Sequence, residues 1–510
     1  MPNTNVSINN KRIAKNTLIL YVRMFILMGI SLYTSRVILQ VLGVDDFGIY
    51  NVVGGVVSMM GVLNGAMSVS TTRYLTFELG KGDMDALKRT FSMCMTIYMM
   101  LSFAFLILAE TIGLWFLNTQ LTIPDDRMTA VNWVFQFTIV TTIFSLLTNP
   151  YNAVIISREK MGIYAYISLL DAVLKLGIVY LLDVLSYDKL IVYGFLLMIL
   201  HFIICAIYFI YCNRCYQESK YKFYWDKNLF KELLAYTGWN LFGSASGIAK
   251  GQGLNILLNM FFTPSVNAAR GIAYQVNAVV TQFFTNFYTA IRPQITKYYA
   301  ANDLDNMFKL VFRSSKMSFF LILLISLPLV IEAPFVINLW LGQLPDYVVP
   351  FMRLIVVITA VDAMATPLMT TAHATGKIAL YQSVVGSMTI LNIPISYIFL
   401  RFGFESLIVF KVSLVISVIN LFIRLWIVKR LVNFPVVDYI KKVFANALLV
   451  TVVSAIIPIL VYLHFDINFM IFVVTCLISV VSTVITVYYI GLQSNERTFV
   501  INTIKNKLHR

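Results

Sequence analysis

The sequence predicts an all-α polytopic membrane protein of about 14 transmembrane helices, arranged as two six-helix lobes plus two C-terminal helices. Three observations lead to this fold class. Only 12% of the 510 residues are charged, about half of the ~25% found in a typical soluble domain. Apolar segments of about 20 residues, long enough to cross ~30 Å of hydrocarbon, recur along the whole chain. Two stretches whose positions differ by 220 also read alike.

Short polar loops separate the expected spans and define three parts of the chain. The N-terminal lobe, residues 1–232, contains spans 1 to 6 at 17–40, 47–72, 90–117, 129–149, 163–183 and 189–212. The C-terminal lobe, residues 233–430, contains spans 7 to 12 at 233–260, 267–291, 316–340, 349–372, 381–401 and 406–427. Residues 431–510 carry spans 13 and 14, at 443–463 and 469–490, and a basic cytoplasmic tail.

The two lobes are expected to be copies of one unit. Two pairs of stretches match in one reading direction: 73–85 with 293–305, and 150–164 with 367–381. Because each copy holds an even number of spans, both have the same topology and are related by an axis along the membrane normal. Such a parallel repeat is typical of transporters.

Basic residues predict the orientation, because Lys and Arg accumulate in cytoplasmic loops. The expected outer loops hold only Arg127, Lys189 and Arg401, whereas the inner loops and both termini are strongly basic. Both termini are therefore expected in the cytoplasm. Most of the net charge of +15 then lies at the cytoplasmic surface of the membrane, where it would contact anionic lipid head groups. We therefore expect no nucleic-acid partner.

We expect neither a cofactor nor a metal, and we do not expect an enzyme. The five cysteines and four histidines lack the mutual spacing of metal ligands. The segments between the spans are short and leave no room for a soluble catalytic domain.

Polar side chains inside spans are costly unless they face the bundle interior or water, so they are the candidate functional residues. The eighth span carries seven at steps of three or four, which places them on one helical face: Arg270, Tyr274, Asn277, Thr281, Thr285, Tyr288 and Arg292. The matching face of the second span is a small or polar stripe that begins at Tyr50. Both faces are expected to line a common cleft, although close packing of small residues is an alternative for the second span.

The seventh and first spans add further candidates. Trp239 and Lys250 share a face of the seventh span, whose many glycines predict a bendable or locally broken helix. Lys250 either faces the cleft or extends to the membrane surface. In the first span, Arg23 and Arg36 are 13 positions apart and lie on nearly opposite faces, so a straight helix turns only one of them to the cleft.

Two deep carboxylates are candidates for ion coupling. Asp171 precedes Lys175 by one helical turn, so mutual neutralisation is the expected arrangement. Asp362 has no local partner; it binds an ion or proton, or it pairs with Arg353 or Lys411 of neighbouring spans. Cations outnumber carboxylates within the spans, which predicts a positive interior suited to an anionic cargo. Arg is a natural phosphate ligand because its planar fork donates paired hydrogen bonds.

Three segments carry a resemblance to a known family: residues 36–50, the Gly-Asp-x-Asp turn at 82–85, and residues 150–153. Over essentially its whole length the sequence resembles the Wzx-like polysaccharide flippases of the multidrug/oligosaccharidyl-lipid/polysaccharide exporter superfamily, which serve O-antigen and lipopolysaccharide biosynthesis. The resemblance implies a two-lobed, 14-helix transporter of the bacterial inner membrane. It also implies alternating access that moves undecaprenyl-diphosphate-linked oligosaccharide from the inner to the outer leaflet.

The resemblance further implies a site and partners. A cationic cleft holds the diphosphate, and its implied ligands are Arg270, Lys250, Arg23 or Arg36, and Arg292. The expected partners are the lipid-linked oligosaccharide, membrane lipids and other membrane proteins of polysaccharide assembly. Asp45 and Asp46 lie in the outer turn of the family, but our preferred interpretation is that they cap the second span.

Three alternatives remain open at this point. A cation-coupled multidrug exporter of the same superfamily would need anionic groups in its cleft, and the sequence offers few. A membrane glycosyltransferase or polymerase acting on the same lipid carrier typically has a large outer loop with catalytic groups, which this sequence does not offer. A scaffold for a glycan-assembly complex is the third.

Overall fold

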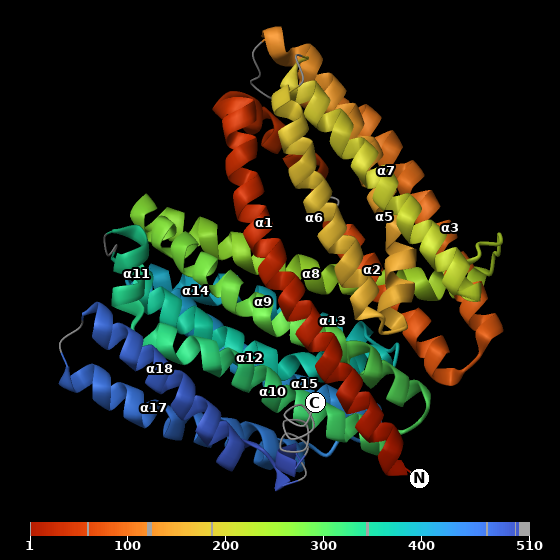
Figure 1. Ribbon diagram of the computed structural model, residues 1–510. Helices are drawn as coiled ribbons and strands as arrows, with labels where there is room; N and C mark the ends of the chain where they lie inside the picture. The colour runs from red at the N-terminus through yellow and green to blue at the C-terminus, as the bar shows by residue number, and fades with distance from the viewer. Residues whose placement is uncertain are drawn as a thin grey trace, which may run out of the picture. The chain divides into compact units, whose positions relative to one another are not determined.

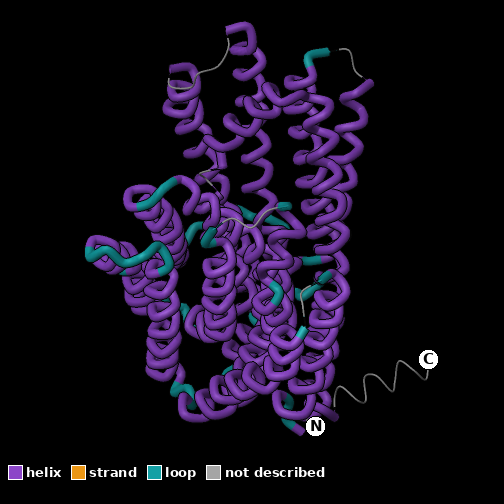
Figure 2. Tube along the Cα trace, turned by 90° about the vertical axis from the view of Figure 1, so that its left-hand side faces the viewer, coloured by secondary structure: helices purple, strands orange, loops and turns teal. Residues whose placement is uncertain are grey.

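All described regular structure in the computed structural model is helical (Figure 2). The structure describes residues 2–58, 61–119, 125–184, 187–342, 346–465, 468–494 and 496–498, without the side chains of 2–11, of residues 183 and 264 and of many residues between 32 and 63. By their contacts the residues divide into two compact units. Unit 1 comprises Met1–Ser244 and Tyr299–Ala301, and unit 2 comprises Ala245–Tyr298 and Asn302–Arg510. The domain boundaries expected at residues 232 and 430 stay predictions.

Most helices are labelled in Figure 1. Those of unit 1 are α1 (Pro2–Ser58), α2 (Gly61–Lys81), α3 (Met84–Leu108), α4 (Leu114–Thr119), α5 (Met128–Ser157), α6 (Met161–Val184), α7 (Lys189–Cys215) and the first half of α8 (Lys227–Phe261). Those of unit 2 are the rest of α8, α9 (Pro264–Ala300), α10 (Leu304–Ile331), α11 (Ala333–Leu341), α12 (Val348–Ala374), α13 (Ala379–Ile390), α14 (Asn392–Arg401), α15 (Ile408–Val432), α16 (Val436–Tyr439), α17 (Asn446–His464) and α18 (Phe469–Thr486).

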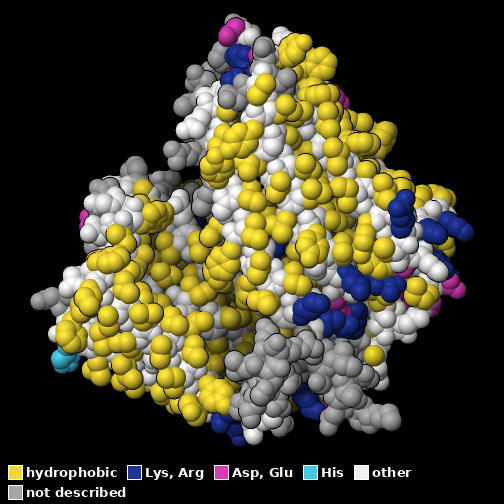
Figure 3. Space-filling view, in the orientation of Figure 1, with side chains coloured by type: hydrophobic (Ala, Val, Ile, Leu, Met, Phe, Trp, Pro, Cys, Tyr) yellow, Lys and Arg dark blue, Asp and Glu magenta, His cyan; other side chains and the backbone are white. Residues whose placement is uncertain are grey.

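Eleven helical segments of the described residues are long and apolar enough to cross a membrane. Helices α8 and α9 are not among them, although they contain 35 and 37 residues. Their polar content, not their length, sets them apart, which agrees with the polar faces expected for spans 7 and 8. Apolar side chains cover most of the visible surface in Figure 3, as expected where helices meet lipid.

The internal repeat is visible in matching helix starts. Asp83 caps α3 by accepting hydrogen bonds from the N–H groups of Asp85 and Ala86. Asp303 caps α10 in the same way, with the N–H of Asn306 as donor. The residue before each cap has positive φ, 80° at Gly82 and 56° at Asn302. The aligned sequences therefore fold alike at this turn.

The second pair of matching stretches also folds alike. Pro150 lies inside α5 and Pro367 inside α12. Each helix is followed by one residue with positive φ, 58° at Glu159 and 78° at Gly376. The equivalent turns thus recur in the same order in both parts of the chain, as a parallel repeat requires.

The chain turns between the first two spans at Gly43, whose φ of 78° lies in the region that favours glycine. Beyond this turn Asp46 forms an ion pair with Arg127, and Arg127 also binds Asp188 at 2.6 Å. Asp188 in turn caps α7. These contacts clamp α1 to the starts of α5 and α7. The capping expected of Asp45 lies outside the described residues.

Each unit has its own aromatic core. In unit 1, Phe91 of α3 packs against Tyr151 of α5 with ring centroids 5.5 Å apart. In unit 2, Phe351 of α12 and Phe410 of α15 are fully buried, and their ring centroids are 4.5 Å apart. These cores hold the helices that carry the polar residues described next.

Candidate functional site

Unit 2 holds four charged residues on α8, α9, α12 and α15: Lys250, Arg270, Asp362 and Arg424. All four side chains are partly buried. Three are cations and one is a carboxylate, so the cluster carries a net positive charge. We call these four residues the cation cluster.

Arg270 is held in place by the end of α8. Its Nη2 donates to the carbonyl oxygen of Gly251 at 2.7 Å, and its Nη1 donates to Asn255 Oδ1 at 3.1 Å. The guanidinium also lies 4.7 Å from the ring centroid of Tyr274, one helical turn further along α9. These contacts leave the buried Nε of Arg270 without a hydrogen-bond partner among the described residues. The guanidinium of Arg270 is therefore held in one orientation, but one of its N–H donors has no hydrogen-bond acceptor among the described residues.

Asp362 is the one carboxylate of the cation cluster. Its Oδ1 accepts a hydrogen bond from Ser417 Oγ at 2.6 Å. Lys250 of α8 and Arg424 of α15 both lie within electrostatic range of this carboxylate. Neither residue proposed from sequence as a pairing partner takes part: Arg353 Nε donates to the carbonyl of Val330 at 2.9 Å, and Lys411 is exposed. The alternative in which Asp362 pairs with Arg353 or Lys411 is therefore not found among the described residues.

Arg424 belongs to a polar stripe that the sequence analysis did not single out as a site. Ser417, Asn420 and Arg424 follow at steps of three and four on α15, which places them on one face. The buried Nε of Arg424 and Oδ1 of Asn420 have no hydrogen-bond partner among the described residues. The same spacing rule that found the face of span 8 would have found this stripe in span 12.

Helix α8 is unbroken through its glycines, which corrects the expectation of a locally broken span 7. Gly253 has a packing role instead: a Cβ placed there would lie 2.5 Å from Ile393 Cδ1 of α14. The glycine thus allows close approach of α8 and α14 beside the cation cluster.

The rest of the predicted α9 face divides into two kinds of residue. Asn277 Oδ1 accepts from Thr359 Oγ1 at 2.8 Å, and the Tyr288 hydroxyl contacts Thr370, so both bind α12. Thr281 and Thr285 donate to backbone carbonyls one turn earlier, and Thr285 is exposed. Tyr274 is 37% exposed, and Arg292 has a partner of its own within the protein. Cleft lining by these residues stays a prediction.

The predicted site residues of unit 1 have mostly local partners. Arg23 Nε donates to Ser168 Oγ at 2.5 Å, and its guanidinium lies 4.4 Å from the ring centroid of Tyr164 on α6. Tyr50 packs against Tyr193 with ring centroids 4.9 Å apart. The side chain of Arg36 lies outside the described residues. Trp239 is 37% exposed and packs against Phe242.

Asp171 and Lys175 form the ion pair expected from their spacing on α6, with Nζ 2.8 Å from Oδ2. Ser168 and His201 line the same small polar pocket as Asp171. The two opposite charges neutralise each other on one helix, so the pair adds no net charge to this part of unit 1.

The fold is similar to solved transporter structures, although no protein-family model matches the chain and no curated protein is similar in sequence. An outward-facing multidrug resistance MATE family transporter of the MOP superfamily aligns with a TM-score of 0.71 at 12% identity, over 84% of this chain and 97% of that one. A MATE structure in complex with MaD3S aligns with a TM-score of 0.69 at 13% identity, over 83% and 97%.

A MOP superfamily transporter from Pyrococcus furiosus Vc1 (DSM3638) aligns with a TM-score of 0.67 at 11% identity, over 82% of this chain and 96% of that one. That protein is described as having a binding pocket of reverse polarity, which suggests a different function for it. This chain therefore has the fold of these transporters, and its described residues include eleven helical segments long and apolar enough to cross a membrane, which confirms the predicted fold class. A fold does not decide the cargo.

Proposed function

We propose that the protein is a flippase that moves an undecaprenyl-diphosphate-linked oligosaccharide from the inner to the outer leaflet by alternating access, for surface polysaccharide assembly. Lys250, Arg270 and Arg424 bind the diphosphate. One observation supports this proposal most strongly: the described cation cluster holds three cations, Lys250, Arg270 and Arg424, and one carboxylate, Asp362.

The geometry of the cluster supports an anionic cargo. Charged groups inside a membrane protein are costly and normally pair with one another or with backbone carbonyls. Arg270 is only partly paired and Arg424 keeps a buried Nε without a partner among the described residues. A diphosphate would neutralise the excess charge and accept hydrogen bonds from both guanidinium groups.

The test is complementation of a bacterial strain that lacks its polysaccharide flippase. Wild type and Arg270→Ala are compared at matched membrane expression, together with Lys411→Ala. Lys411 is an exposed cation on α15 that has no ion-pair partner among the described residues, so it controls for loss of a charge. Surface glycan and internal lipid-linked precursor are both measured.

We expect wild type and Lys411→Ala to restore surface glycan, and Arg270→Ala to leave precursor inside the cell. The loss should be about 10- to 100-fold, because a hydrogen bond to a charged group contributes about 1.5–3 kcal/mol. Equal export by all three proteins would remove the cation cluster from the mechanism.

A cation-coupled multidrug exporter is the second candidate, because Asp362 supplies a membrane-embedded carboxylate and one of the similar structures is a multidrug resistance transporter. Such an exporter would use Asp362 to bind the coupling ion or a cationic drug. Drug resistance without glycan rescue in the same strain would favour this candidate over the flippase.

A further inference from the structure

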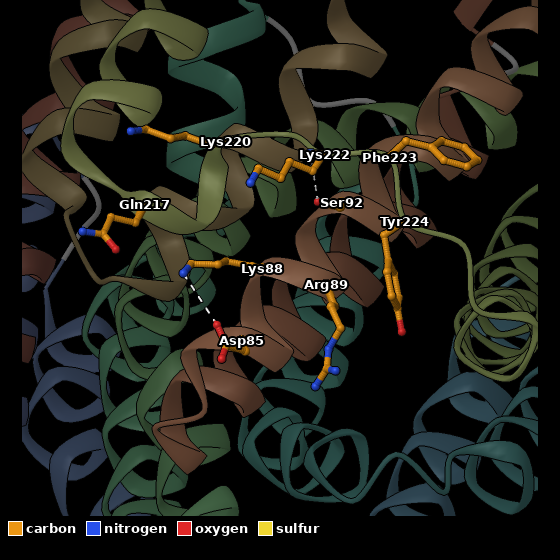
Figure 4. Close-up of a pocket in the computed structure, with 9 residues that line it drawn as sticks. All are labelled: Asp85, Lys88, Arg89, Ser92, Gln217, Lys220, Lys222, Phe223 and Tyr224. Carbon is orange, nitrogen blue, oxygen red and sulfur yellow. Dashed lines mark hydrogen bonds and ion pairs between the residues drawn. The ribbon is translucent and has the colours of Figure 1, made fainter.

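A second cationic site lies in unit 1, apart from the cation cluster. A pocket of about 660 Å³ opens between the first two turns of α3 and the segment 217–224, which connects α7 to α8. Figure 4 shows Lys88, Lys220 and Lys222 on one side of this pocket, with Arg89 and Tyr224 on the other. We call it the basic pocket.

Positive charge in the basic pocket exceeds negative charge. Asp85 is the carboxylate that lines it, and its Oδ1 lies 3.6 Å from Lys88 Nζ (Figure 4). Lys220 and Lys222 have no ion-pair partner among the described residues. Arg89 interacts with Asp226 only at longer range. The pocket therefore offers at least two uncompensated ammonium groups to a ligand.

The segment that carries these lysines is held in place by contacts with α3 and with the end of α5. Glu218 is 1% exposed, and its carboxylate lies 2.7 Å from Arg158 Nη2 at the end of α5. The Tyr221 hydroxyl hydrogen-bonds to Thr96 of α3 at 3.3 Å, and the N–H of Lys222 donates to Ser92 Oγ at 3.4 Å. The lysines thus extend from a held backbone, so little ordering is needed when an anion binds.

The position of the pocket indicates where the anion comes from. The pocket lies at the start of the candidate span Met84–Thr119 and just after the end of the candidate span Lys189–Cys215. The ends of spans lie at a membrane surface. Phe223 lines it and is 74% exposed, and nearby Trp225 is 48% exposed. Exposed aromatic rings beside Lys and Arg are typical of the head-group layer of a bilayer.

We propose that the basic pocket binds the phosphate of an anionic membrane lipid, with Lys220, Lys222 and Arg89 on the head group and Phe223 in the adjoining lipid. The contacts are electrostatic and reversible, and no covalent step is involved. This inference is independent of the cargo proposed above, because it uses different residues in the other unit.

Native mass spectrometry of the full-length, detergent-solubilised protein tests it. Phosphatidylglycerol is titrated into wild type, into Arg89→Gln/Lys220→Gln/Lys222→Gln, and into Lys429→Gln/Arg430→Gln/Lys441→Gln. The last variant removes three exposed cations that do not line the pocket and is the matched control. Phosphatidylcholine and inorganic phosphate are added separately as the zwitterionic lipid and the free anion.

We expect wild type and the control variant to retain phosphatidylglycerol, and the pocket variant to bind it about 100-fold more weakly, since each basic residue near an anionic membrane contributes about fivefold. Equally weakened phosphatidylglycerol binding in both variants would overturn the proposal, because any group of basic residues at the membrane surface would then have the same effect. Displacement of the lipid by millimolar phosphate would contradict the proposal that the bound phosphate group belongs to a membrane lipid. If the triple variant does not fold, Lys222→Gln alone is used, with a fivefold weakening expected and no change contradicting the proposal.

Discussion

The membrane-embedded charges of the two units differ in how they are compensated. In unit 1, Lys175 pairs with Asp171 one turn away, and Arg23 donates to Ser168 and stacks on Tyr164. In unit 2, the cation cluster holds three cations, Lys250, Arg270 and Arg424, and the single carboxylate Asp362.

The comparison supports the proposal that the binding site lies in unit 2. An i,i+4 ion pair inside a helix neutralises itself and contributes mainly to stability. A surplus of partly buried cations destabilises the empty protein by mutual repulsion, and an anion relieves that repulsion. We therefore assign binding to the cation cluster and a structural role to the Asp171–Lys175 pair.

The largest effect should come from removing two cations of unit 2. Arg270→Ala combined with Arg424→Met deletes both guanidinium groups, and we expect export to fall at least 100-fold, since each hydrogen bond to a charged group contributes about 1.5–3 kcal/mol. Arg23→Met in unit 1 is the matched change and should reduce export far less. Equal losses in a quantitative precursor-accumulation assay would break the comparison between the units.

The ion pair of unit 1 should act on stability. Asp171→Asn leaves the Lys175 ammonium without its partner and should lower the free energy of unfolding by about 1 kcal/mol, the scale found for polar pairs in membrane proteins. Adding Lys175→Met should restore most of that loss. Thermal unfolding in detergent measures both, and a double variant less stable than the single one would contradict neutralisation as the role of the pair.

A smaller effect is expected at Asp362. Asp362→Asn removes the negative charge but keeps an acceptor for Ser417, so a diphosphate should bind as tightly as before or up to about fivefold more tightly. Affinity for a short-chain isoprenyl diphosphate is the measurement. Loss of all transport in Asp362→Asn, with binding intact, would instead support ion coupling through this carboxylate.

The smallest effect should appear at the Arg127–Asp188 clamp of unit 1. Burial would raise the pKa of Asp188, but the N–H of Ile191 and the Arg127 guanidinium outweigh burial and lower that pKa below its usual value. Its contribution to stability is then complete above the unfolded pKa of ~3.9 and is lost as pH falls through the lower folded pKa. Asp188→Asn still caps α7, but the melting temperature of this variant should fall less than that of wild type as the pH is lowered. The same fall in melting temperature for both proteins between about pH 5 and 3 would contradict this contribution of Asp188.

The sequence predicted features that depend on local spacing. The polar face of α9 and the Asp171–Lys175 pair both follow from residues within a few positions of one another. The all-helical membrane fold followed from hydropathy and the repeat in the same way.

Features that depend on packing between distant segments were not predicted. Arg270 is held by Gly251 and Asn255, and Asp362 by Ser417, 55 positions away. These contacts depend on the crossing of helices, and helical periodicity says nothing of which face meets which neighbour. Arg424 of span 12 was not singled out from sequence for the same reason.

The central claim is that the cation cluster of unit 2 binds a diphosphate, and a binding titration tests it most directly. Purified protein is titrated with a short-chain isoprenyl diphosphate by calorimetry, as wild type and as Lys250→Ala, Arg270→Ala, Arg424→Met and Lys411→Ala. We expect wild type and Lys411→Ala to bind alike, and each cluster variant to bind about tenfold or more weakly. Equal affinity in all five proteins, or no binding by wild type, would contradict the account.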